Sequence, residues 1–157
     1  MKNIEEQEKK AALLADDLTS LESYIHDLFY FSPLPLSFIS PIGVLLEVNP
    51  SFEELANLRS YELVGEPIEE LFVKKEIEKI AKETFKKGGV RGKEINFFPK
   101  GKEKIRVKIY TKERKDERGE TVGYFLCIFD MTEIKKLEDK LKEEIKKLKE
   151  KLKKRKK

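Results

Sequence analysis

Few residues in this chain of 157 could carry out chemistry. It has one histidine, His26, and one cysteine, Cys127. A nucleophile–histidine–carboxylate arrangement would need His26, which falls outside the apolar middle of the chain. The paired carboxylates Glu53–Glu54 and Glu69–Glu70 lie on helix faces that we expect to be exposed, with no second catalytic group beside them. A single cysteine also excludes an internal disulfide or a multi-cysteine metal site. We therefore predict a protein that is not an enzyme and holds no metal.

The local sequence around His26 is Tyr-Ile-His-Asp-Leu, which resembles the phosphoacceptor box of sensor kinases. The proline that follows such a histidine is displaced, since Pro33 lies seven residues further on. The chain also has no glycine-rich phosphate loop and no kinase nucleotide-binding boxes. We therefore expect His26 to be an exposed or capping residue that is not phosphorylated.

Charge is abundant and unevenly distributed. Charged residues make up 41% of the chain and hydrophobic residues 39%, which leaves enough apolar side chains for one core. Residues 131–157 hold thirteen Lys and Arg and six Asp and Glu, so this end carries +7 and the remainder −3. A basic end of this kind could contact nucleic acid or an anionic membrane. It has no aromatic residue to stack on bases, so a solvated helix end is the simpler interpretation.

Hydropathy and composition bear on location and source. No stretch approaches the roughly 18 apolar residues that span a bilayer, and the N-terminus lacks a signal-peptide core. We expect a cytoplasmic protein with no membrane span. Lys and Glu are abundant whereas Gln, Met and Cys are scarce, a balance similar to that of thermophile proteins.

The elements that must position any site begin with a helix over residues 4–30. Its apolar residues are spaced alternately by three and four positions, as in the seam of a coiled coil. Two partners for this seam remain open, a second helix or the chain's own domain. The seam comprises Ala11, Leu14, Leu18, Leu21, Ile25 and Leu28.

The middle of the chain alternates short strands and helices. Pro33 and Pro35 end the first helix, and Asn49–Pro50 is a good N-cap followed by a good first helical residue. The pattern predicts an α+β fold, in which five antiparallel strands carry short helices on one face. The expected strands are 36–40, 44–48, 91–99, 104–112 and 121–130, and the expected helices are 50–58, 60–64, 67–72 and 74–87.

The strand over 121–130 is apolar on both faces, so its second face needs a cover. We expect Phe125, Cys127 and Phe129 to face the core. Tyr124, Leu126 and Ile128 would then form a partner surface, covered by the first helix or by a second subunit.

A last helix begins near Thr132. Its apolar residues follow an eleven-residue pattern, which predicts a nearly straight or slightly right-handed supercoil. We expect it to pair in a homodimer, and we divide the chain into an N-terminal helix (1–31), a central domain (32–131) and a C-terminal helix with a basic tail (132–157). The expected dimer residues on this helix are Ile134, Leu137, Leu141, Ile145 and Leu148, followed by Leu152 in the same pattern.

Three short motifs occur in order along the chain. The segment P-L-S-F-I-S-P-I-G-V-L-L-E-V-N-P-S-F-E-E-L opens the central domain, S-Y-E-L-V-G follows, and Asp130-Met131-Thr132-Glu133 closes it. Together they resemble the PAS domain family over about residues 34–134. The resemblance implies a sensor domain whose exit motif passes a signal into the following helix, with Asn49, Asp130 and Thr132 as signal-transmission residues.

The resemblance also implies a place for a ligand, between the long helix and the sheet. Heme is not expected because 74–87 lacks a usual heme ligand, and covalent flavin is not expected because Leu58-Arg59-Ser60 stands where its reactive cysteine would be. We expect either a core filled by its own side chains or a small apolar ligand such as a fatty acid. The candidate lining is Phe38, Leu46, Leu55, Leu71, Ile77, Ile80, Phe85, Ile95, Phe97, Val107, Phe125, Cys127 and Phe129.

These observations favour a non-catalytic PAS sensor and dimerisation module, part of a sensor kinase or similar signalling protein with an output domain downstream. The alternative is a standalone scaffold that binds another protein without a ligand. A nucleic-acid adaptor that uses residues 146–157 ranks last.

Overall fold

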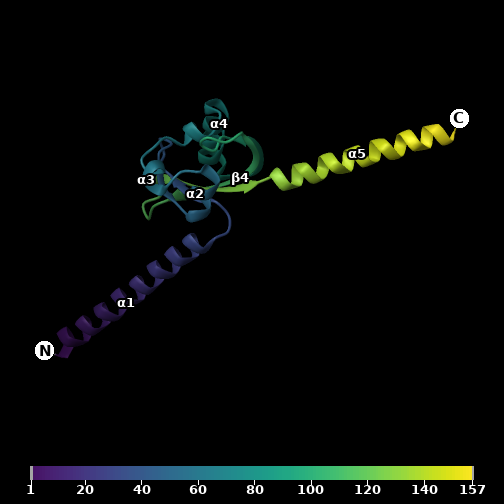
Figure 1. Cartoon of the computed structure of the whole chain (residues 1–157). Coiled ribbons are helices and arrows are strands. Elements are labelled where there is room, and N and C mark those ends of the chain that lie inside the picture. The colour runs from purple at the N-terminus through teal and green to yellow at the C-terminus, as the bar shows by residue number, and fades with distance from the viewer. Residues whose placement is uncertain (1, 157) are drawn as a thin grey trace.

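A central domain carries two long terminal helices that extend away from it in different directions (Figure 1). The computed structural model describes residues 2–156. The terminal helices are α1 (Lys2–Phe31) and α5 (Thr132–Arg155), and neither has a buried residue. Between them lie β1 (Leu36–Ile39), β2 (Leu45–Val48), α2 (Pro50–Ala56), α3 (Ser60–Leu63), the 3-10 helix η1 (Ile68–Leu71), α4 (Lys74–Lys87), β3 (Gly89–Phe97), β4 (Ile105–Lys115) and β5 (Thr121–Asp130).

The strands form one five-stranded sheet in the order β2-β1-β5-β4-β3, and every neighbouring pair is antiparallel. Apolar side chains from α2, α3, η1 and α4 join those of one sheet face in a single core. The expected α+β class and strand arrangement are confirmed, because alternating apolar patterns and turn residues specify both strands and helices locally.

The side-chain direction predicted for β5 is wrong. Tyr124, Leu126 and Ile128 are 0–1% exposed and belong to the core, whereas Phe125 and Phe129 are 43% and 38% exposed on the opposite face. Cys127 also lies on that outer face, half-buried. The expected partner surface of β5 is therefore interior, and the expected pocket residues of β5 point outward.

The pairing of β5 with β4 accounts for this reversal. Ile109 pairs with Ile128 and Thr111 with Leu126, and paired residues share a face of the sheet. Because β4 is polar on one side and apolar on the other, it determines which side of β5 faces inward. The same reasoning corrects Phe38, which pairs with Phe125 on the outer face.

Leu46 needs a similar correction. It is 41% exposed on the edge strand β2, where Leu45 and Val48 supply the buried side chains. The pairing of β1 with β2 is irregular between Phe38 and Ile39, and such a bulge breaks simple alternation.

The seam of α1 does not pack on the chain's own domain. Leu14, Leu18, Leu21, Ile25 and Leu28 are 53–64% exposed, and only the last turn of α1 approaches the domain. Of the two partners left open by the sequence, the chain's own domain is therefore excluded in this conformation.

Candidate functional site

Asn49 joins α1 to the central domain. Its Nδ2 group donates hydrogen bonds to the carbonyl oxygens of Phe29 and Leu34, each at 3.0 Å. Its Oδ1 atom accepts from the backbone N–H groups of Leu36 (2.9 Å) and Phe52 (3.0 Å). The residue is fully buried. One side chain thus ties the end of α1, the start of β1 and the first turn of α2 together, in addition to its expected N-cap role.

A second contact reinforces this N-terminal joint. The Ser51 hydroxyl donates to the carbonyl oxygen of Ser32 at 2.7 Å, just beyond the last residue of α1. Asn49 and Ser51 together hold the short segment 32–35 against the start of α2. Because that segment also contains Pro33 and Pro35, the direction in which α1 leaves the domain is restrained.

The C-terminal joint is built around Asp130. Its Oδ1 atom accepts from the backbone N–H of Thr132 at 2.9 Å and from the Thr132 hydroxyl. Met131 occupies the N-cap position of α5, and Thr132 is the first helical residue. The carboxylate of Asp130 therefore accepts a hydrogen bond from a backbone N–H in the first turn of α5. Its negative charge is favoured there because the N-terminal end of a helix is positive.

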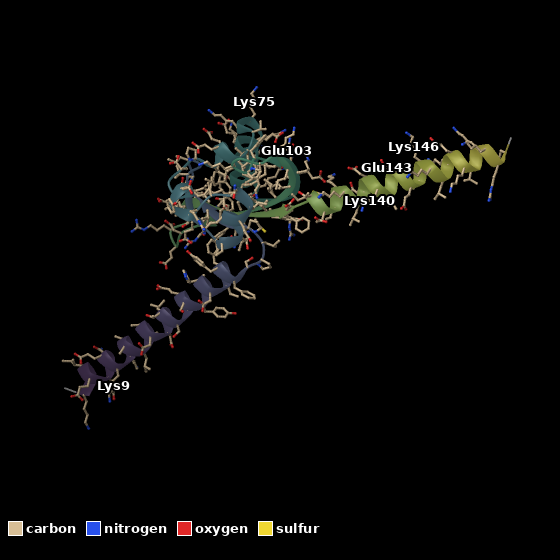
Figure 2. The ribbon with its side chains drawn as sticks, in the orientation of Figure 1. Lys9, Lys75, Glu103, Lys140, Glu143 and Lys146 are labelled. Atoms are coloured by element: carbon tan, nitrogen blue, oxygen red, sulfur yellow. The ribbon has the colours of Figure 1, made fainter. Side chains whose placement is uncertain are left out.

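Further contacts attach the first turns of α5 to the sheet. The Met131 N–H donates to the carbonyl of Arg106 at 3.0 Å, and the Met131 side chain is buried. Lys135 forms an ion pair with Glu94 at 3.6 Å, and Glu94 also pairs with Arg106 at 3.6 Å. Beyond this point the helix is solvated, and Figure 2 shows Lys140, Glu143 and Lys146 on the part of α5 that extends beyond the domain.

The two joints are adjacent in the sheet. The N–H of Ile128 donates to the carbonyl of Pro35 at 3.0 Å. This bond is next to Leu36 and Cys127, the first residue pair between β1 and β5. Pro35 lies four residues after the end of α1, and Ile128 lies four residues before the start of α5. A displacement of one helix joint therefore has a short, hydrogen-bonded route to the other.

A hollow lies between α4 and the β1–β2 hairpin. Its volume is about 550 Å³, and Tyr124 forms part of its floor. The hydroxyl of Tyr124 is buried and has no hydrogen-bond partner among the described residues. Burial raises the pKa of this phenol. The remaining lining is mainly apolar: Pro41, Ile42, Gly43, Val44, Pro67, Ile68, Ile77, Ala81 and Phe85, with Glu69, Glu78 and Lys82 at the rim.

The structure divides the residues that were expected to line a ligand pocket. Six lie in the core below α4 and η1, namely Leu71, Ile77, Ile80, Ile95, Phe97 and Val107. Leu55 and Phe85 are partly buried against that core. Phe38, Leu46, Phe125, Cys127 and Phe129 lie elsewhere, as described above. Tyr124 lines the hollow, although the sequence analysis had placed it on a partner surface.

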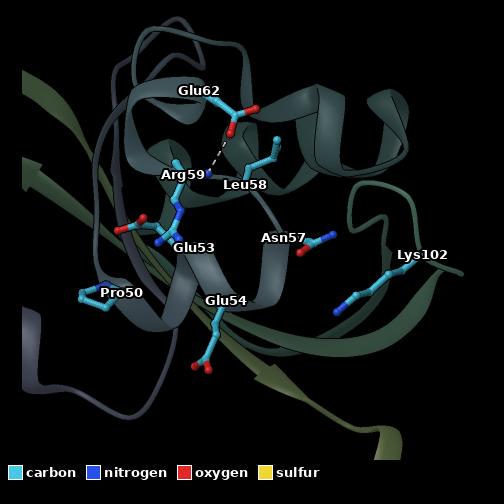
Figure 3. Close-up of a pocket in the computed structure, with 8 residues that line it drawn as sticks. All are labelled: Pro50, Glu53, Glu54, Asn57, Leu58, Arg59, Glu62 and Lys102. Carbon is cyan, nitrogen blue, oxygen red and sulfur yellow. Dashed lines mark hydrogen bonds between the residues drawn. The ribbon is translucent and has the colours of Figure 1, made fainter.

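A second surface hollow is polar and lies beside α2 and α3. Its volume is about 870 Å³, and Glu53, Arg59, Glu62 and Lys102 contribute to it (Figure 3). Glu53 and Glu62 accept from the backbone N–H groups of Ser60 (3.2 Å) and Arg59 (3.3 Å), so both carboxylates serve the start of α3. Figure 3 shows Glu54 pointing away from that pair.

Other candidate chemistry is dispersed. His26 is exposed on α1 with its ring 4.2 Å from the ring of Tyr30. Burial raises the pKa of the Cys127 thiol, which disfavours its reactive thiolate. Within residues 2–156 no group of three or more His, Cys, Asp or Glu side chains could hold a metal ion. No helix in the same range is long and apolar enough to cross a membrane.

Comparisons with known proteins agree with this architecture. At 17% identity and a TM-score of 0.65, the PAS domain of a protein from Colwellia psychrerythraea matches 72% of this chain and 98% of its own. The PAS domain of an HTR-like protein from Haloarcula marismortui has 20% identity and a TM-score of 0.61, with 76% and 98% covered. An RNA-binding light-oxygen-voltage receptor has 16% identity and a TM-score of 0.67, with 80% of this chain and 37% of that one covered. No curated protein matches.

The five-stranded sheet with its short helices is the fold of these PAS domains. The family model of the PAS domain matches residues 35–133. The chain belongs to the PAS domain family, as its motifs predicted.

Proposed function

We propose that this chain is a non-catalytic sensor module that relays a conformational change between α1 and α5, acting as a homodimer within a sensor kinase or a similar signalling protein. The observation that carries the proposal is the hydrogen bond between Ile128 and Pro35, which links the two helix joints. The N-terminal joint is held by Asn49 and the C-terminal joint by Asp130. A packed sheet transmits such displacements because its interior has few alternative arrangements.

The hollow beside Tyr124 is the proposed input site. An apolar ligand with one polar group would fit its lining, and the unpartnered Tyr124 hydroxyl would bind that group. Such a ligand would contact α4 and the hairpin whose first strand, β1, pairs with β5. Binding there would therefore bear on the same strand pair that connects the joints.

Hydrogen exchange on the full chain tests the relay. The variant Asn49→Ser keeps a helix-capping oxygen but loses the donors to Phe29 and Leu34. We expect faster exchange in residues 28–36 and also in the first turns of α5, residues 130–137. Asn57→Gly is the matched control, since Asn57 ends the same helix with a positive φ of 57° that glycine adopts readily. Faster exchange in 28–36 with no change in 130–137 would reject the relay.

Native mass spectrometry tests the input site. Freshly purified protein is measured intact and then denatured to release any bound molecule. A non-covalent mass that is lost in Tyr124→Phe supports a ligand at the hollow. A mass that is retained equally by Tyr124→Phe, or no mass at all, contradicts the proposed role of this hydroxyl.

A further inference from the structure

The two halves of α5 differ in charge. Residues 132–144 contain five acidic and four basic residues, whereas residues 145–156 contain eight Lys or Arg and one acidic residue, Glu150. The second half, defined here as the basic segment, therefore carries a net charge of +7. It lies on the part of α5 that extends beyond the central domain (Figure 1). Because residues 1–130 carry −3, positive charge gathers at one end of the molecule.

The basic segment is also amphipathic. Ile145, Leu148 and Leu152 form its apolar stripe and are 45–60% exposed. Glu150 lies two positions from each leucine, which at 3.6 residues per turn places it on the opposite side of the helix. Four cations lie three or four positions from a stripe residue and therefore border the stripe. They are Lys149, Lys151, Arg155 and Lys156.

The cations of the basic segment have no counter-charge beside them. Among the described residues, the ion pairs of α5 involve only Lys135, with Glu94 and Glu138. No cation of the basic segment lies within 4.0 Å of a described carboxylate. Every residue of the segment is exposed. Its cations and its apolar stripe are therefore both available to a partner.

Pairing with a second α5 does not neutralise these cations. In a parallel helix pair, the residues that border the apolar stripe face one another across the seam. In the first half of α5 such positions hold both signs, as in Glu138, Lys140 and Glu144. From Lys151 onward every bordering position is basic, and Lys151 of one helix would face Lys156 of the other. The first half therefore suits a helix pair, and the end of the basic segment does not.

We propose that the basic segment binds an anionic lipid surface. A helix with Leu and Ile on one side and Lys and Arg around them lies in the plane of a membrane, with its apolar side among the acyl chains. The bordering cations then reach the negative headgroups, and Glu150 points to water. Nucleic acid would match the charge but would leave the apolar stripe exposed, so a lipid surface satisfies more of the segment.

The charge distribution confines this contact to the end of α5. Residues 1–130 are negative in sum, so an anionic surface does not attract the central domain. Met131 and Lys135 attach the first turns of α5 to the sheet. The bound segment would therefore hold the central domain near the membrane through one continuous helix. This inference goes beyond the proposed relay and does not depend on it.

Co-sedimentation of the full chain with lipid vesicles tests the proposal. We expect binding to vesicles of equal parts phosphatidylcholine and phosphatidylglycerol, no binding to phosphatidylcholine alone, and release as the salt concentration rises. Lys149→Glu with Lys151→Glu should weaken binding to the anionic vesicles about tenfold or more. Lys75→Glu with Lys79→Glu on α4 is the control, because it makes the same change in net charge at exposed positions. It should leave the affinity within about twofold, since charges far from the lipid surface are screened.

The apolar stripe provides a separate measurement. The chain has no tryptophan, so Leu148→Trp places a single fluorescent reporter in the basic segment. Its emission should shift to shorter wavelength when the anionic vesicles are added, because the indole enters an apolar environment. Leu148→Ser with Leu152→Ser should weaken vesicle binding about tenfold or more, since both side chains lose their burial in the lipid.

Three results would overturn the proposal. The first is no binding to the anionic vesicles at low salt, or an equal loss of binding in the two charge variants. The second is a reporter whose emission the vesicles leave unchanged, which would show that the stripe stays out of the lipid. The third is tight binding of RNA or DNA that the double serine variant leaves intact, together with vesicle binding that this variant does not weaken. That result would assign the basic segment to nucleic acid.

Discussion

Ile128 donates its backbone N–H to the carbonyl of Pro35, and this bond lies at the end of the antiparallel pairing between β1, which follows α1, and β5, which precedes α5. Both residues lie four positions from their helices. The central domain thus separates two helices whose attachment points are neighbours in the sheet. A relay between the two helices would need such proximity of their attachment points.

Asn49→Ala should lower the free energy of unfolding by about 2–4 kcal/mol. The substitution removes the four hydrogen bonds of a buried side chain, and each net hydrogen bond is worth about 1 kcal/mol. Urea unfolding measures the loss. Ser51→Ala removes one bond of the same joint and should cost only about 1 kcal/mol. Equal losses in the two variants would contradict the central role of Asn49.

Gly123→Ala should destabilise the domain by several kcal/mol or prevent folding. Gly123 has a φ of 143°, and an added Cβ would overlap the carbonyl oxygen of Ile39 in the paired strand. Gly119→Ala is the matched control, with a φ of 81° and no atom within 4 Å of the added Cβ, so it should cost only about 1 kcal/mol. Thermal unfolding of both variants checks the difference. A Gly123→Ala protein as stable as Gly119→Ala would show that β1 and β5 are not so closely paired.

Tyr124→Phe should leave the stability of the ligand-free protein unchanged or raise it by about 1 kcal/mol. The hydroxyl is buried without a partner, and an unsatisfied buried polar group is costly. Urea unfolding of protein from which any bound molecule has been removed checks this. A loss of 1 kcal/mol or more would mean that the hydroxyl is hydrogen-bonded in the folded protein.

Alkaline pH should destabilise the protein through the same residue. Burial raises the pKa of Tyr124 above its ordinary value, so the folded state keeps the proton that the unfolded state loses near pH 10. The contribution is fully present below about pH 10 and is lost as the pH rises further.

The Tyr124→Phe variant isolates this effect. Its stability should fall less steeply above pH 10 than that of the original chain, because the other alkaline groups are the same in both. Parallel pH profiles for the two proteins would contradict the assignment.

The sequence by itself determined the element order and placed most helix and strand boundaries within about two residues of the observed ones. The expected range of α4, 74–87, is the observed one, and β5 begins and ends at the expected residues. Local signals suffice here, because Asn49–Pro50 starts a helix, Gly88 ends one with a φ of 90°, and alternation identifies β4. The same local motifs, in order, were enough to indicate the PAS family.

Only the tertiary structure decided which face of β5 points inward. Both faces of this strand are apolar, so alternation gives two equal solutions, and the pairing of Ile128 with Ile109 selects one. The roles of Asn49 and Tyr124 were decided in the same way. The local sequence identifies Asn49 as a helix cap, but its hydrogen bond to Phe29 joins residues that are 20 positions apart. Such contacts depend on where distant segments meet in space, which no local pattern specifies.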